Sequence, residues 1–148
     1  MKWNWQNRNW PQFIYNEEDF KDYELKFFEN AGVLSGSIKH IDDQEQEALK
    51  VDLISDEAYK TSEIEGEILN RDSIHSSIRK HLGLEVDHRR VQPAEQGIAE
   101  MMVDLYHNYE NPLDQKSLSL WHEMLTNGRR DLEDIGRYRR HDDPMQIV

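Results

Sequence analysis

The 148-residue chain contains no cysteine, only four prolines and seven glycines, and no long apolar run. Without cysteine it has no disulfide, no thiolate nucleophile and no cysteine ligand for zinc. No stretch approaches the roughly 20 apolar residues that a membrane-spanning helix needs, and the amino-terminal MKWNWQNRNW lacks the apolar core of a secretory signal. We therefore expect a cytoplasmic protein that has no membrane partner.

Basic residues are also scarce, because 18 Lys and Arg stand against 30 Asp and Glu and leave a formal net charge of −12. Binding to DNA or RNA generally depends on a basic patch that displaces counterions from phosphates. Arginines do gather in residues 129–140, but acidic residues are interleaved with them. The balance of charge therefore predicts no nucleic-acid partner.

Apolar residues recur at intervals of three and four in five segments, which is the spacing of helices that bury one face. The expected helices run from Asn16 to about Leu34, from Asp42 or Asp43 to about Glu65, from Asn70 or Asp72 to Gly83, from Pro93 to Asn111, and from Asp114 to Asn127. Alternating segments typical of strands are almost absent, so the sequence predicts an all-α domain.

The two ends of the chain depart from this pattern. Residues 1–15 carry Trp3, Trp5 and Trp10 without helical spacing, and we expect an extended arm that packs its aromatic rings onto the domain. A platform for stacking nucleotides is the alternative, although no basic cluster accompanies the rings. At the other end, residues 145–148 look like the first residues of a strand. Either another element covers that strand or the chain is a fragment.

A search for catalytic motifs returns little. The sequence contains no phosphate-binding loop, dinucleotide-binding glycine motif, nucleophile elbow or HExxH zinc pair. No two of the seven histidines are four residues apart, so we predict no metal site. His122 follows Trp121 near the apolar face of its helix, where we expect a hydrogen-bonded histidine at the edge of the core rather than a catalytic base.

One acidic residue continues an apolar stripe. At about 100° per residue, Glu65 lies on the same helix face as Val51, Ile54 and Ala58, and Thr61 is close to that face. A carboxylate on an apolar face needs a partner such as Arg or Lys, because an isolated buried charge is costly. The alternative is that the helix has already ended and that Glu65 bends into solvent with Gly66.

These residues are similar to a known pattern. Thr61-Ser62-Glu63-Ile64-Glu65-Gly66 matches the inhibitory motif (S/T)xxxE(G/N) of the Fic family, with Thr61, Glu65 and Gly66 at the defined positions. Further segments along the whole chain resemble the same family: Trp3-Asn4-Trp5-Gln6, Trp10-Pro11, Asn70-Arg71-Asp72-Ser73-Ile74, Leu82-Gly83-Leu84, Pro112-Leu113, Trp121-His122 and Gly136-Arg137-Tyr138-Arg139.

The resemblance implies a Fic-like helical bundle in two parts, an N-terminal domain with the inhibitory helix over residues 1–90 and the first core helices over residues 91–148. It also implies that Met145, Gln146 and Ile147 begin the β strand of a flap that binds the target. Fic proteins usually transfer AMP from ATP to a protein hydroxyl, with Mg²⁺ and a loop of pattern HxFx(D/E)GNGR. The inhibitory Glu competes with the ATP γ-phosphate for the arginine of that loop, which identifies Glu65 as the inhibitory residue.

The catalytic loop pattern itself is absent from the 148 residues. The chain therefore has no catalytic residue of its own, and we expect no ATP or Mg²⁺ on the chain alone. The first hypothesis is a truncated regulatory part of a Fic adenylyltransferase that acts on its missing core in cis. The second is a free-standing, antitoxin-like module that inhibits a separate Fic protein in trans, and a homodimer stays possible in either case. A helical interaction domain that merely contains the motif is the third reading.

Overall fold

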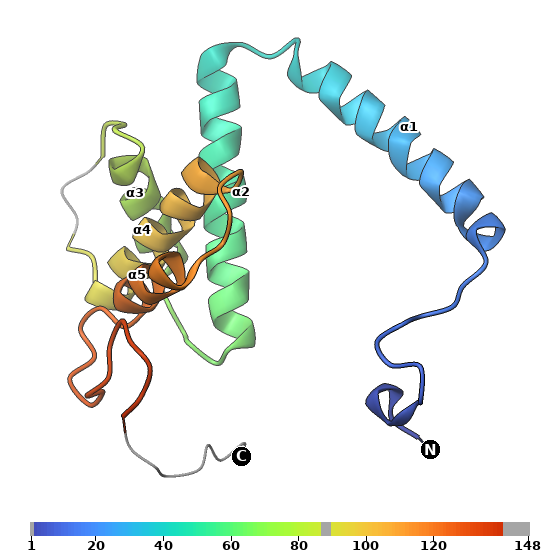
Figure 1. Ribbon diagram of the computed structural model, residues 1–148. Coiled ribbons are helices and arrows are strands. Elements are labelled where there is room, and N and C mark those ends of the chain that lie inside the picture. The colour runs from blue at the N-terminus through green and yellow to red at the C-terminus, as the bar shows by residue number, and fades with distance from the viewer. Residues whose placement is uncertain (1, 87–89, 141–148) are drawn as a thin grey trace. The chain divides into compact units, whose positions relative to one another are not determined.

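The structure is a computed structural model that describes residues 2–86 and 90–140 (Figure 1). Within these residues the chain is helical and has no strand, which confirms the all-α prediction. The expected flap strand, with Met145, Gln146 and Ile147, lies outside the described residues. The helices are two short 3-10 turns, Asn4–Gln6 and Glu17–Phe20, and α1 (Lys21–Ile38), α2 (Asp43–Ile64), α3 (Arg71–His81), α4 (Pro93–Asn108) and α5 (Gln115–Leu125).

The chain divides into two compact units, Met1–Gln46 and Glu47–Val148. The boundary falls within the first turn of α2, whereas the matched family segments led us to expect a division after residue 90. The expected division separates two segments that resemble different parts of the Fic family, not two compact units, and it stays a prediction. The two units are described separately below.

In the first unit, aromatic side chains pair with one another instead of entering a core. Trp3 stacks on Trp5 with ring centroids 4.9 Å apart, and Trp10 meets Phe13 edge to face at 5.4 Å. None of the described residues of its helices is buried, and Trp3 stays 63% exposed. The expected burial of the aromatic arm is therefore not confirmed, because this unit offers the rings no apolar core.

The helix α1 starts later and ends later than its apolar pattern predicts. A 3-10 turn at Glu17–Phe20 comes first, and the side chain of Asn16 accepts a hydrogen bond from the backbone N–H of Glu18. The helix then continues past Gly32 and Gly36 to Ile38. A glycine weakens a helix by only about 1 kcal/mol, so two of them need not end it.

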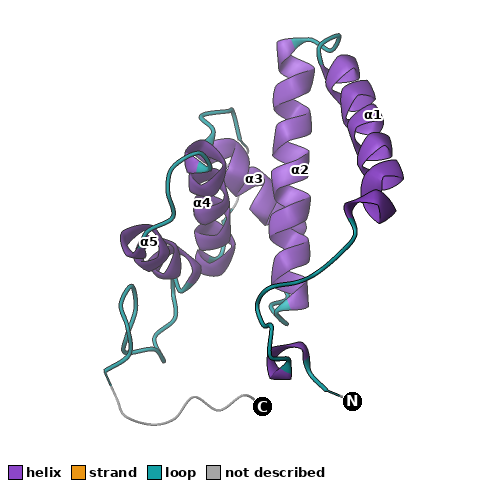
Figure 2. Cartoon of the chain, turned by 45° about the vertical axis from the view of Figure 1, so that its right-hand side comes forward, coloured by secondary structure: helices purple, strands orange, loops and turns teal. Residues whose placement is uncertain are grey.

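The second unit contains the hydrophobic core, to which α2, α3 and α4 each contribute one face. Its buried apolar side chains are Val51, Ile54, Ala58, Ile74, Ile78, Ile98, Ala99, Met102 and Val103. Helix α3 packs on α4, and α4 packs on α5 (Figure 2). The apolar stripe predicted over Val51, Ile54 and Ala58 thus enters the core with one face each of α3 and α4, while the apolar face of α5 is only partly covered.

Local capping explains the starts of α3, α4 and α5 that the sequence predicts. The Asn70 side chain accepts a hydrogen bond from the Ser73 N–H at 3.0 Å. Asp114 accepts from the Ser117 N–H and from its hydroxyl, both at 2.8 Å. These bonds satisfy donors that a helix start would otherwise leave unpaired. Pro93 occupies the first position of α4, where its missing N–H carries no penalty.

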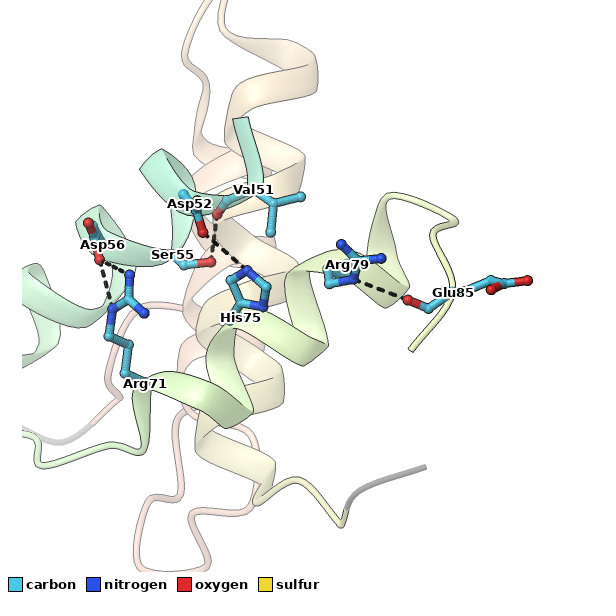
Figure 3. Close-up of polar contacts among 8 residues, drawn as sticks. All are labelled: Val51, Asp52, Ser55, Asp56, Arg71, His75, Arg79 and Glu85. Atoms are coloured by element: carbon cyan, nitrogen blue, oxygen red, sulfur yellow. Dashed lines mark hydrogen bonds and ion pairs between the residues drawn. The ribbon is translucent and has the colours of Figure 1, made fainter. Parts of the chain in front are cut away.

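Polar pairs on the surface join α2 to α3 (Figure 3). The guanidinium of Arg71 donates two hydrogen bonds to Asp56, at 2.8 and 2.5 Å. His75 Nε2 lies 3.2 Å from Asp52 Oδ1. Because both acidic side chains are 60% exposed, solvent screens these pairs and each contributes little to stability. Burial of apolar side chains, rather than these pairs, therefore holds α3 on α2.

Candidate functional site

The three predicted motif residues Thr61, Glu65 and Gly66 lie together at the carboxyl end of α2. The helix ends at Ile64, and the chain then reverses in a Schellman turn. The Gly66 N–H donates to the Glu63 carbonyl at 3.1 Å, and the Glu67 N–H donates to the Ser62 carbonyl at 2.9 Å. Gly66 has a φ of +81°, a left-handed conformation that glycine and, less readily, asparagine adopt. The conformation at position 66 thus favours glycine or asparagine there.

Glu65 is the last residue before this reversal. Its backbone N–H donates to the Thr61 carbonyl at 3.2 Å, while its side chain is exposed. The carboxylate forms no ion pair with any residue in the described part of the chain. Of the two alternatives for Glu65, the one in which the helix has ended and the side chain enters solvent is confirmed.

The buried face of α2 bypasses Thr61. It passes from Ala58 to Ser62, four residues on, and Thr61 lies exposed on the solvent side of that line. Ser62 tolerates burial because its hydroxyl donates to the Ala58 carbonyl at 2.8 Å. Thr61 is thus exposed but still lies beside this face, since it lines the same cavity as Ser62 and Ile98.

A cavity of about 290 Å³ lies beside the end of α2. Residues from the loop after α2, from α4 and from the end of α5 form its apolar wall, namely Leu69, Ala94, Ile98, Met101 and Leu125. Thr61, Ser62, Glu65, Glu67 and Arg129 add polar atoms to its lining. The motif residues thus border an apolar cavity that the sequence did not predict.

Among the described residues, the one cationic side chain that lines this cavity is already engaged. Arg129 donates to both carboxylate oxygens of Asp131, at 2.8 and 2.7 Å. These hydrogen bonds lower the pKa of Asp131 to about 2. The contact of Arg129 with Glu67 is longer, 3.9 Å between Nη1 and Oε1. Arg129 therefore neutralises Asp131 first, which leaves negative charge at the cavity.

Glu95 supports the loop that follows Glu65. Its carboxylate is 6% exposed and accepts two backbone hydrogen bonds of 3.0 Å, from the N–H of Asn70 and from the N–H of Gln92. One side chain thereby joins the starts of α3 and α4. Sequence reasoning missed this role, although Glu95 stands three residues after Gln92, at the spacing of a capping box.

Close contact between α4 and α5 depends on Gly97. A Cβ at this position would overlap the carbonyl oxygen of Met124 and lie 3.1 Å from the Cβ of Asn127.

The predicted core-edge histidine, His122, is hydrogen-bonded: its Nδ1 atom accepts a hydrogen bond of 2.9 Å from the Gly136 N–H. The expectation of a hydrogen-bonded histidine at the edge of the core is confirmed.

Metal-binding groups and membrane-spanning helices were the remaining features considered. In residues 2–86 and 90–140, no three His, Asp or Glu side chains are grouped so that they could hold a metal ion. No described helix is both long and apolar enough to span a membrane.

Comparison with known proteins identifies the family. The model of a domain of unknown function, DUF4172, matches residues 3–84, which is more than half of the chain. The chain therefore belongs to the DUF4172 family. The match includes α1, α2 and α3 and ends one residue after Gly83, at the turn that closes α3. No curated protein matches the sequence.

Proposed function

We propose that this chain is the regulatory, N-terminal part of a Fic-type protein adenylyltransferase, with Glu65 as the inhibitory residue. The observation that carries the proposal is the position of Glu65, whose exposed carboxylate stands at a fully capped helix end without a partner in the described residues. Thr61 and Gly66 flank it in the pattern (S/T)xxxE(G/N), and Gly66 has a left-handed backbone conformation, which favours glycine or asparagine.

A carboxylate in this position is suited to capture an arginine. The Schellman turn fixes the backbone on both sides of Glu65, so little backbone entropy is lost when the side chain binds. A guanidinium can then donate two parallel hydrogen bonds to the carboxylate, which is the strongest common ion-pair geometry. In the family that the motif resembles, that guanidinium holds the γ-phosphate of ATP, so Glu65 and ATP would compete for it.

The groups that would hold ATP and Mg²⁺ are not among these 148 residues, because the pattern HxFx(D/E)GNGR is absent. The role of this chain is therefore to present Glu65 to a catalytic core. The core is either part of the same polypeptide, in cis, or a separate Fic protein, in trans. Both arrangements use the same end of α2.

The cis arrangement is tested in the intact protein that joins this chain to a Fic core. Glu65→Gly should raise self-labelling with AMP from labelled ATP by about 10- to 100-fold, because a hydrogen bond to a charged group is worth about 1.5–3 kcal/mol. Glu63→Gly is the matched control, since Glu63 lies on the same helix end but pairs with Lys60 at 2.8 Å. Equal labelling of the two variants would contradict the role of Glu65.

The trans arrangement is tested with the purified chain and a Fic adenylyltransferase that lacks its own inhibitory glutamate. The wild-type chain should lower AMP transfer in proportion to its concentration, and the Glu65→Gly chain should not. If the coding sequence continues into no Fic core and the chain leaves such an enzyme unaffected, the proposed function is wrong.

A further inference from the structure

We propose that the cavity beside Glu65 is an anchor site for an apolar side chain, and that its occupant is a protein segment carrying a cationic side chain next to that apolar one. The inference rests on the proposed function, since it describes the partner that Glu65 faces. It adds a second point of contact, which the motif residues alone do not contain.

The size and lining of the cavity favour one side chain. Its volume of about 290 Å³ is at the lower limit of small-ligand pockets and too small for a helix. The wall runs from the core to the surface, since Ile98 is 4% exposed and Leu125 is 45% exposed. An apolar group that enters this space would bury the exposed part of Leu125 and complete a core that is otherwise open on this side.

The charges around the cavity favour a cationic neighbour for that group. Among the described residues that line it, Glu65 and Glu67 present two carboxylates, while the one guanidinium, from Arg129, is hydrogen-bonded to Asp131. Excess negative charge attracts a cation and repels an anionic ligand such as a nucleotide phosphate. The position of Glu65, which lines the cavity itself, requires the cationic and apolar groups of the partner to be adjacent.

The cavity wall is also held in place before any partner binds. Glu95 ties the N–H of Asn70 to the start of α4, so the loop that carries Leu69 is fixed at its far end. The Schellman turn at Gly66 fixes the near end of the same loop. A preformed wall loses less entropy on binding than a flexible one, which favours specific recognition.

The first test uses the full 148-residue chain and three small probes, followed by NMR of the methyl groups and backbone amides. Butylguanidinium carries both groups, guanidinium only the cation, and 1-butanol only the apolar tail. Butylguanidinium should shift the signals of Leu69, Ile98, Leu125 and Glu65, and should bind at least about tenfold more tightly than either other probe. Equal affinity for guanidinium, or shifts elsewhere in the chain, would overturn the anchor site.

Two variants sharpen this test. Ala94→Met fills the cavity and should abolish the advantage of butylguanidinium over guanidinium, whereas Ala48→Met, at an exposed position of α2, should leave it unchanged. Equal effects of the two variants would overturn the proposal. Shifts at Leu125 that depend on chain concentration without any probe would mean that a second copy occupies the cavity, and would also overturn it.

Measurement of AMP transfer separates this proposal from the proposed function. In the intact protein, Ala94→Met should raise self-labelling as Glu65→Gly does, because the anchor is lost while the carboxylate remains. If Glu65→Gly raises labelling and Ala94→Met does not, the anchor site is wrong and the proposed function stands. If neither variant raises labelling, the proposed function is wrong, and so is the partner proposed for the cavity.

Discussion

The carboxylate of Glu95 accepts a hydrogen bond from the backbone N–H of Asn70, 25 residues earlier in the chain, at 3.0 Å. The same carboxylate accepts from Gln92, so a single buried side chain fixes where α3 and α4 begin. The four residues between Glu65 and Asn70 thus connect two anchored points. This contact and the shared core of α2 and α4 together position the motif end relative to α4.

Replacing the buried carboxylate should weaken the second unit. In Glu95→Gln, one oxygen becomes an amide nitrogen that cannot accept from a backbone N–H, so one buried donor loses its partner. We expect a loss of about 1–3 kcal/mol in the free energy of unfolding, measured by urea titration. Glu100→Gln, on the same helix, is the control and should change stability by less than about 0.5 kcal/mol. Equal losses in the two variants would contradict the role of Glu95.

The turn at Gly66 should not accept alanine without cost. At a φ of +81° an alanine side chain is strained, so Gly66→Ala should lower the free energy of unfolding by about 1–2 kcal/mol. Gly66→Asn should lose less, since asparagine enters this region more readily. Gly32→Ala, inside α1 with open space around it, is the control and should stabilise its helix. Circular dichroism during urea titration measures all three, and a stable Gly66→Ala variant would contradict the turn.

Alanine at Gly97 should separate α4 from α5. The added Cβ would overlap the backbone carbonyl oxygen of Met124, which can move only if α5 moves with it. We expect a loss at the upper end of the range of about 1–3 kcal/mol that overpacking costs. Because Trp121 donates a hydrogen bond of 2.7 Å to Asp104 across the same two helices, its fluorescence should change as well. Unchanged stability and fluorescence would show that the helices are not this close.

The start of α5 should depend on pH through Asp114. The backbone and side-chain hydrogen bonds from Ser117 lower the pKa of Asp114. A lowered pKa in the folded state means that the stabilisation is complete above the unfolded value of about 3.9 and is lost as pH falls through the folded value. The stability difference between wild type and Asp114→Asn should therefore be constant above about pH 5 and change only in acid. A difference that changes between pH 6 and 8 would contradict this assignment.

The sequence predicts the parts of this fold that depend on neighbouring residues. Asp114, and Asn70 as one of two candidates beside Asp72, were predicted as helix starts, since a cap is satisfied by a residue three positions on. The core stripe of α2 followed from its periodicity for Val51, Ile54 and Ala58. The same periodicity left Glu65 with two alternatives, because a helical angle has meaning only while the helix continues.

Features that join distant segments were beyond this reasoning. Glu95 accepts a hydrogen bond from Asn70, 25 residues earlier in the chain, and no local spacing predicts that contact. The cavity beside Glu65 needs three segments in place before it exists. The burial expected for Trp3 and its neighbours is not confirmed within their own unit, since a sequence shows that a residue is apolar but not which surface covers it.

The left-handed residue at the end of α2 has a consequence for the chemistry of the motif. Position 66 contributes its left-handed backbone conformation rather than a close contact, since no heavy atom outside residues 65–67 lies within 4 Å of the place where its Cβ would be. A D-alanine introduced there by chemical ligation would be free of the strain that its L-enantiomer meets. Residue 66 thus acts through the handedness of its backbone. The left-handed conformation reverses the chain directly after Glu65 and so leaves the Glu65 side chain exposed at the end of α2.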